Sequence, residues 1–164
     1  MKKIFLLLLF ALVSMGSYAQ FEKGTKYVGA SLTGLNLSYS SGEKFGLGLQ
    51  AMGGYFFADS WMATARLEYV HQWMPSPQRD RNEVVLGAGA RYYFLSNGIY
   101  LGAGLQYKHA AVDKDYLQLP IEVGYCYYLN HFVSIEPAIY FEPCLNKFSD
   151  GTRVGLKIGF GFYF

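Results

Sequence analysis

The chain has 164 residues and a formal net charge of +2, and 18% of its residues are aromatic whereas only 16% are charged. Soluble domains carry nearer 25% charged residues, so this composition favours a protein with a large apolar surface. The sequence contains no basic block that would bind nucleic acid and, after residue 20, no run of about 18 apolar residues that would form a transmembrane helix.

Residues 1–19 have the pattern of a secretory signal peptide. Met1-Lys2-Lys3 is a basic start, residues 4–13 are apolar, and Ser17-Tyr18-Ala19 is a small-residue cleavage site. The apolar stretch is too short to span a bilayer as a helix. We therefore expect export and cleavage before Gln20, with residues 20–164 forming one domain. Without Lys2 and Lys3 the 14 basic residues fall to 12, which equals the 12 acidic residues.

A two-residue alternation begins at residue 26 and continues to the end of the chain. In residues 26–39, Val28, Ala30 and Leu32 fit one parity whereas Leu35, Leu37 and Tyr39 fit the other, which predicts a bulge near Thr33-Gly34. In seven further segments every second residue is uncharged: 45–57, 61–69, 84–94, 99–107, 117–127, 133–141 and 154–164. Only a β-strand places every second residue on one face. The pattern predicts about eight strands whose apolar face is buried in lipid or in a core.

The connections between these segments are of two kinds. Residues 58–60, 95–98 and 129–131 are short and follow aromatic strand ends, whereas 40–44, 72–82, 109–115 and 143–152 are mostly longer and more polar. Short periplasmic turns, longer outer loops and aromatic girdles are typical of bacterial outer-membrane barrels. We expect both termini in the periplasm and an outer girdle made of Tyr39, Phe45, Tyr69, Trp73, Tyr107, Tyr116 and Phe141.

The intervening residues of the same strands are mainly glycines and balanced charges. The charged residues are Arg66, Glu68, Glu83, Arg91, Lys108, Glu122, Glu136, Glu142, Arg153 and Lys157. A barrel of about eight strands has an interior just wide enough for side chains, so glycine there makes room for a large polar neighbour. Opposite charges in such an interior must pair. We predict a structural charge network at mid-depth that fills the lumen, formed by Arg66, Glu68, Arg91, Glu122, Glu136 and Lys157.

The chain resembles the small outer-membrane β-barrel family of Gram-negative bacteria, which includes proteins described as porin-family or outer-membrane β-barrel domain proteins. The matching pieces are the leader, the hairpin Gly54–Trp61, the strand Leu117–Tyr125 and the C-terminal Phe160-Gly161-Phe162-Tyr163-Phe164. The resemblance implies an all-β, eight-stranded antiparallel up-and-down transmembrane β-barrel in the outer membrane, in contact with lipid and lipopolysaccharide. It also implies that Phe160, Phe162 and Phe164 form the signal that the barrel-insertion machinery reads. The family is functionally mixed, so the fold does not give an activity.

The main alternative fold is a secreted soluble barrel of the lipocalin type. That barrel would turn the apolar row inward around an apolar ligand and the mixed row toward water. The alternation alone fits both folds. The glycine-rich mixed row, the aromatic strand ends and the final Phe164 favour the membrane barrel, which must place Leu119 and Ile158 outside and Arg91 inside.

No metal site, cofactor or disulfide is expected. His71, His109 and His131 share no spacing that would bind a metal. Cys126 precedes a turn, whereas Cys144 lies at the far end of the next strand. At about 3.3 Å per residue this separation is too large for a disulfide.

Catalysis is not expected either. An enzyme that modifies lipid A would need a His–Ser–acid group near the outer rim. Ser76 and Ser149 fall in loops, whereas Ser134 and Glu136 lie near His131 at the periplasmic end.

The sequence therefore favours a non-catalytic integral outer-membrane barrel with a structural or interaction role in the cell envelope. An envelope or extracellular protein partner would bind the loops at 72–82 and 143–152, because function collects on loops. The alternative is a narrow channel or a lateral-opening transporter for small or hydrophobic molecules. Pro120 and Pro137 bear on that alternative, since each lacks a ladder donor and would mark a local strand opening, although a bulge with no transport role is the interpretation we prefer.

Overall fold

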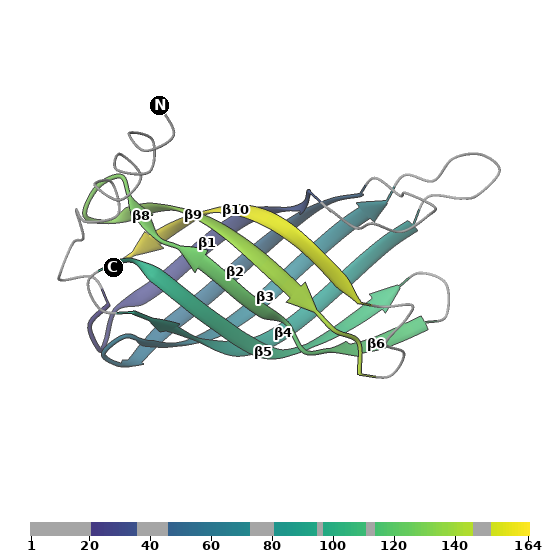
Figure 1. Ribbon diagram of the computed structural model, residues 1–164, viewed down its shortest axis with the longest axis horizontal. Helices are drawn as coiled ribbons and strands as arrows, with labels where there is room; N and C mark the ends of the chain where they lie inside the picture. The colour runs from purple at the N-terminus through teal and green to yellow at the C-terminus, as the bar shows by residue number, and fades with distance from the viewer. Residues whose placement is uncertain (1–20, 36–45, 73–80, 95–96, 111–113, 146–151) are drawn as a thin grey trace, which may run out of the picture.

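In the computed structural model the chain forms one antiparallel sheet that closes on itself (Figure 1). The structure describes residues 21–35, 46–72, 81–94, 97–110, 114–145 and 152–164. Within these ranges the strands are β1 (Lys26–Leu35), β2 (Gly46–Ala58), β3 (Trp61–Gln72), β4 (Arg81–Tyr93), β5 (Ile99–Ala110), β6 (Lys114–Gln118), β7 (Ile121–Tyr125), β8 (Tyr127–Tyr128), β9 (Val133–Glu142) and β10 (Arg153–Tyr163). No helix in the described part of the chain is long and apolar enough to cross a membrane.

Strands β6, β7 and β8 are pieces of one span. β5 pairs Gln106 with Gln118 of β6 and Ala103 with Ile121 of β7, so one register continues across the gap. The gap between β6 and β7 contains Pro120, which has no N–H to donate to the ladder. β9 pairs with both β7 and β8, and β10 closes the barrel by pairing with both β9 and β1. The predicted eight-stranded antiparallel up-and-down barrel is therefore confirmed.

The two faces of the wall differ as the alternation predicts. Leu49 and Ile158 lie on the outside with 60% and 46% of their surface exposed, and Leu119 is partly exposed. Arg91 belongs to the intervening row and is 2% exposed. An apolar outer face and a charged inner face are the reverse of a lipocalin-type barrel, so that alternative is wrong.

The first strand contains the irregularity that its sequence predicts. The register between β1 and β10 shifts after Leu32, which pairs with Ile158, and resumes at Leu35, which pairs with Leu156. Three steps along β1 therefore match two steps along β10, as in a bulge. The change of parity near Thr33-Gly34 has its cause here. Leu37 and Tyr39, which also carried that prediction, lie outside the described residues.

Both described chain ends lie at one end of the barrel, which we call the turn end. Lys26 and Phe164 exchange backbone hydrogen bonds of 2.7 and 3.0 Å there, and Figure 1 shows the C-terminus at the same end as the β8–β9 turn. The short connections from β2 to β3 and from β4 to β5 also lie at this end, where Gly98 adopts a φ of 73° that L-residues rarely take. The opposite end, the loop end, has connections that fall largely outside the described residues.

The predicted outer girdle is correct only in part. Tyr69, Tyr107 and Phe141 are exposed on the outside, with 39–49% of their surface accessible. Tyr116 was expected with them, but it is buried in the lumen, where Lys108 Nζ lies 5.7 Å from its ring centroid. The prediction of Tyr116 was wrong because it followed the aromatic character of the residue, whereas the neighbouring Leu117 takes the outward position of the pleat. Tyr39, Phe45 and Trp73 lie outside the described residues.

Candidate functional site: the filled lumen

Charged side chains from five spans meet at the middle of the lumen. We call this group the central cluster; it contains Arg66, Arg91, Glu122, Glu136 and Lys157. Arg91 on β4 donates through Nε to Glu122 Oε1 at 2.6 Å and through Nη1 to Glu136 Oε2 at 3.0 Å. Lys157 on β10 donates to Glu122 Oε2, and Arg66 Nη1 lies 3.8 Å from the same oxygen. Each of these side chains is almost fully buried.

Glu122 therefore faces three cations from three strands. Burying a carboxylate is costly unless it is both paired and hydrogen-bonded, and this arrangement provides both. Arg91 gains further contacts because its guanidinium lies 4.4 Å from the ring centroid of Tyr100 and 5.6 Å from that of Tyr27. The geometry makes Glu122 and Arg91 the two groups on which the central cluster depends most.

Glu136 is held mainly by hydroxyl groups. Tyr27 Oη donates to its Oε2 at 3.0 Å, while Tyr163 Oη and Ser134 Oγ donate to its Oε1 at 2.8 and 2.9 Å. Together with Arg91, these donors occupy both oxygens of the carboxylate. The sequence pattern missed Tyr27, Ser134 and Tyr163 because they are uncharged, although their parity places them in the lumen row.

Glu68 was predicted as a member of the charge network, and the structure places it one step away from the central cluster. Thr33 Oγ1 donates to Glu68 Oε1 at 2.7 Å, and Gln50 Nε2 donates to Oε2 at 3.4 Å. Gln50 Oε1 in turn accepts from Lys157 Nζ at 3.4 Å. Gln50 thus joins Glu68 to Lys157, a link that charge patterning alone could not reveal.

A second group of charges lies nearer the loop end. This loop-end cluster contains Glu83, Lys108, Glu142 and Arg153. Lys108 Nζ lies 2.5 Å from Glu83 Oε2, and Arg153 Nη2 lies 2.9 Å from Glu142 Oε2. Arg153 Nη1 also lies 3.8 Å from Glu83, so the two pairs are connected. Beside this cluster, the side chains of the cross-strand partners Gln106 and Gln118 form a hydrogen bond of 3.0 Å inside the lumen.

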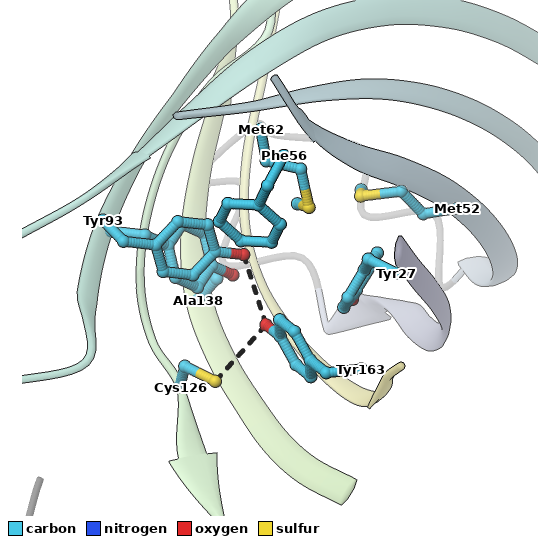
Figure 2. Close-up of a cluster of buried hydrophobic side chains, with 9 residues drawn as sticks. Tyr27, Met52, Phe56, Met62, Tyr93, Cys126, Ala138 and Tyr163 are labelled. Carbon is cyan, nitrogen blue, oxygen red and sulfur yellow. Dashed lines mark hydrogen bonds between the residues drawn. The ribbon is translucent and has the colours of Figure 1, made fainter. Parts of the chain in front are cut away.

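Aromatic side chains fill the turn end. Phe56, Tyr93 and Tyr100 are fully buried, and Figure 2 shows Phe56 and Tyr93 packed beside Tyr163 and Cys126. The hydroxyl groups of Tyr93 and Tyr163 are 3.3 Å apart, and Cys126 Sγ lies 3.4 Å from Tyr163 Oη. The lumen therefore contains an aromatic layer, the central cluster and the loop-end cluster in succession.

The free space beside the central cluster is small. A cavity of about 10 Å³ lies beside Tyr27, Arg91, Tyr100, Glu136 and Lys157. That volume has room for about one water molecule. The buried hydroxyl of Tyr100 lines this cavity and has no hydrogen-bond partner among the described residues. The described part of the lumen is a packed interior.

Glycines provide the space for the large inward side chains. Gly102 is the cross-strand partner of Glu122, and a Cβ at Gly102 would lie 2.6 Å from Glu122 Cγ. Gly124 faces Tyr100 in the same way. The inner row is therefore rich in glycine because the charged and tyrosine side chains opposite it need the space that a Cβ would take.

The other candidate residues that the structure describes are not brought together in one group. His71 Nδ1 contacts Asn82 Oδ1 and His109 Nδ1 contacts Asp115 Oδ1, each at 2.8 Å on the exposed surface near the loop end. His131 lies at the turn end. Ser76 and Ser149 fall outside the described residues, and Ser134 donates to Glu136 inside the lumen.

The cysteines and the possible metal ligands are also spread through the structure. Within the described ranges, no cluster of three or more His, Cys, Asp or Glu side chains could hold a metal ion. Cys126 and Cys144 are free thiols, and both are buried. Cys126 lies in the aromatic layer. Cys144 follows β9 toward the loop end, where its backbone forms an isolated antiparallel β-bridge with Gln118.

Neither a family model nor a curated protein matches the sequence. Solved structures do match. Neisserial surface protein A is 22% identical with a TM-score of 0.70, over 87% of this chain and 100% of that one. The N-terminal β-barrel domain of Pseudomonas aeruginosa OprF is 17% identical with a TM-score of 0.61, over 87% and 98% of the two chains.

The outer membrane protein Ail of Yersinia pestis, determined in a phospholipid bilayer nanodisc, is 12% identical with a TM-score of 0.60, over 87% of this chain and 100% of that one. At these identities the similarity is one of fold. The closed sheet, the apolar outer face and the filled lumen agree with that similarity, and the chain has the fold of the small eight-stranded outer-membrane β-barrels.

Proposed function

We propose that residues 20–164 form a non-catalytic barrel of the bacterial outer membrane that has a structural or interaction role and conducts no solute. The observation that carries this proposal is the filled lumen, in which the central cluster leaves a cavity of only about 10 Å³. In this proposal the leader of residues 1–19 is removed on export, the turn end faces the periplasm and the loop end faces outward.

The outer face supports a membrane location. Leu32, Leu105 and Ile139 are each more than half exposed, and similar apolar side chains surround the barrel. Monomeric soluble proteins rarely leave so continuous an apolar surface in water, whereas the hydrocarbon of a bilayer covers such a surface at no cost. Lipid and lipopolysaccharide are therefore the immediate neighbours that we propose for this chain.

The C-terminal strand supports assembly by the barrel-insertion machinery. Phe160, Phe162 and Phe164 lie on the outer face of β10 and its end, with 49%, 48% and 64% of their surface exposed. Their side chains form one outward row that a partner protein could reach before lipid covers it. We propose that this row is the insertion signal.

Planar-bilayer recordings test the absence of conduction. The refolded protein is expected to give no steady current above the bare bilayer, because paired charges and aromatic rings occupy the lumen. A wide porin inserted into the same lipid shows that the assay detects open channels. Stable unitary currents from correctly folded protein would contradict the proposal.

A second candidate function, lateral passage of hydrophobic molecules, is favoured by the seam between the β6–β8 span and β9. Backbone hydrogen bonds run from Leu129 N to Val133 O at 2.8 Å and from Leu119 N to Pro143 O at 3.0 Å. They show that the backbone N–H and C=O groups of odd-numbered residues around β9 point toward this seam. Pro137 has the same parity, so the β9 side lacks two ladder donors, at Pro137 and Pro143. β7 ends at Tyr125, opposite Pro137.

An apolar groove lies over this seam. It has a volume of about 440 Å³, and Tyr125, Pro137, Ile139 and Ile158 are among the residues that line it. On the inner side of the same wall lie Cys126 and Glu136, the residues adjacent to Tyr125 and Pro137. Local separation of β7 and β8 from β9 would connect the groove with the lumen.

Uptake of a hydrophobic fluorescent probe into vesicles separates the two functions. Pro137→Val restores an N–H that can donate to Tyr125 O, and Ile139→Val alters the groove without changing a donor. A barrel without passage gives uptake equal to protein-free vesicles for the unaltered protein and both variants, which is our expectation. If the unaltered protein and Ile139→Val admit the probe and Pro137→Val admits it several-fold more slowly, lateral opening is the function.

A further inference from the structure

One ring of the aromatic layer comes from outside the strands. Phe21 precedes β1, yet its ring stacks on Tyr93 with centroids 4.2 Å apart and an interplanar angle of 23°. Tyr128, Phe56 and Tyr163 surround it with centroid distances of 5.9, 6.1 and 6.2 Å. We call the four rings around Phe21 the aromatic box; they belong to Phe56 on β2, Tyr93 on β4, Tyr128 on β8 and Tyr163 on β10.

The backbone around Phe21 is fixed across the mouth of the barrel. Ser60 N donates to Phe21 O at 2.8 Å, and Lys23 N donates to Asp59 Oδ1 at 2.9 Å. Gly24 N also donates to Phe56 O at 2.8 Å. The segment 21–25 therefore follows the β2–β3 turn, and this path directs the phenyl ring into the box.

Buried polar groups lie behind this ring. Tyr163 Oη contacts Tyr93 Oη at 3.3 Å and Cys126 Sγ at 3.4 Å, and it donates to Glu136 at 2.8 Å. Figure 2 shows the first two of these contacts. Cys126 is 3% exposed although it lies close to the turn end. Phe21 is only partly buried, so it forms the boundary between this group and the solvent outside the mouth.

We propose that the aromatic box is a binding site for a planar aromatic ring, that Phe21 is its ligand within the chain, and that this ring closes the turn end of the lumen. The proposal goes beyond the proposed function, since it concerns how one mouth is closed and holds whether or not the barrel conducts. The walls of the box are strand residues held by the barrel ladders, whereas Phe21 is held by a short segment. An apolar cavity left in a rigid wall stays open to small aromatic molecules.

The two free thiols provide reporters for a test. Cys144→Ser leaves only Cys126 in the aromatic layer, and Cys126→Ser leaves only Cys144 toward the loop end. The refolded full chain, with and without Phe21→Ala, is labelled with a small water-soluble methanethiosulfonate in detergent. We expect Phe21→Ala to raise the labelling rate of Cys126 by about tenfold or more while that of Cys144 stays unchanged, because opening is local.

Chemical rescue tests whether the box is preformed. Benzyl alcohol added to Phe21→Ala is expected to return the Cys126 labelling rate toward that of the unaltered chain, and cyclohexylmethanol, which is similar in size but not planar, is expected to do so poorly. Phe132→Ala is the matched control, since Phe132 is 64% exposed at the same end and outside the box. This control is expected to leave both labelling rates unchanged.

Three results would overturn the proposal. The first is a Cys126 labelling rate in Phe21→Ala equal to that of the unaltered chain. The second is an equal rise at Cys126 and Cys144, which would mean general loosening of the barrel. The third is equal rescue by the planar and the non-planar alcohol. None of these results depends on a conductance measurement, so failure here is distinct from failure of the proposed function.

Discussion

Glu122→Gln is expected to destabilise the barrel by about 3–5 kcal/mol, the usual cost of removing one partner from a buried ion pair. The substitution preserves the shape of the side chain. It leaves Arg91, Lys157 and Arg66 facing a neutral amide in a region from which water is nearly absent. The folded, fast-migrating form on an unboiled gel should convert to the unfolded form at a clearly lower temperature, and urea unfolding in lipid vesicles gives the free energy directly.

Asp115→Asn is the matched control for this prediction. It makes the same chemical change in a carboxylate that contacts His109 at 2.8 Å, but the Asp115 side chain is 54% exposed. Exposed pairs contribute about 0–1 kcal/mol, so this variant should unfold close to the unaltered protein. Lys157→Met combined with Glu122→Gln should recover part of the loss, because it removes one of the unpaired cations. The idea of a charge network that stabilises the barrel fails if Glu122→Gln raises the conductance strongly and leaves the stability unchanged.

Gly102→Ala is expected to lower the stability by about 1–3 kcal/mol, although only a methyl group is added. The new Cβ would lie 2.6 Å from Glu122 Cγ and 2.9 Å from Glu122 Oε1, so the carboxylate must move away from Arg91. Urea unfolding in vesicles measures the loss. Gly53→Ala is the control, since a Cβ at Gly53 on the outer face meets no atom within 4 Å.

The physical reason for the Gly102 effect can be tested separately with a double-mutant cycle. If the methyl group acts through Glu122, then Gly102→Ala should cost little in a Glu122→Ala background, because the space is already empty. The two free-energy changes would then be strongly non-additive, as residues in contact usually are. Additive changes would show that Gly102 matters for the backbone and not for the position of the carboxylate.

The faces of the strands could be read from the sequence because the pleat repeats every two residues. The bulge near Thr33 was predictable for the same reason, since an inserted residue reverses the parity. Tyr116 shows where this reasoning fails: its type suggested the girdle, but its position in the pleat places it beside Lys108. Parity was the better guide, because the ladder fixes it, whereas aromatic residues occur on both faces.

The partners inside the lumen were less predictable. Arg91 and Glu122 meet over Gly102 of β5, which pairs with Arg91 on one side and with Glu122 on the other, so the registers of two ladders decide that meeting. Gln50 joins Glu68 to Lys157 without carrying a charge, so no charge pattern could indicate it. Phe21 belongs to no strand, and its place in the aromatic box depends on the path of the segment that follows.

The order of the chain gives the central cluster a consequence for assembly. Lys157 and Tyr163 belong to the last strand, and Tyr27 belongs to the first, yet all three contact Glu122 or Glu136. Glu136, which bonds to Tyr27 of the first strand, therefore completes its set of contacts only when the sheet has joined its own two edges. A partly formed sheet would keep these charges in water, so their ion pairs and hydrogen bonds stabilise the protein only at a single late step. The mature barrel should therefore form in an all-or-none manner.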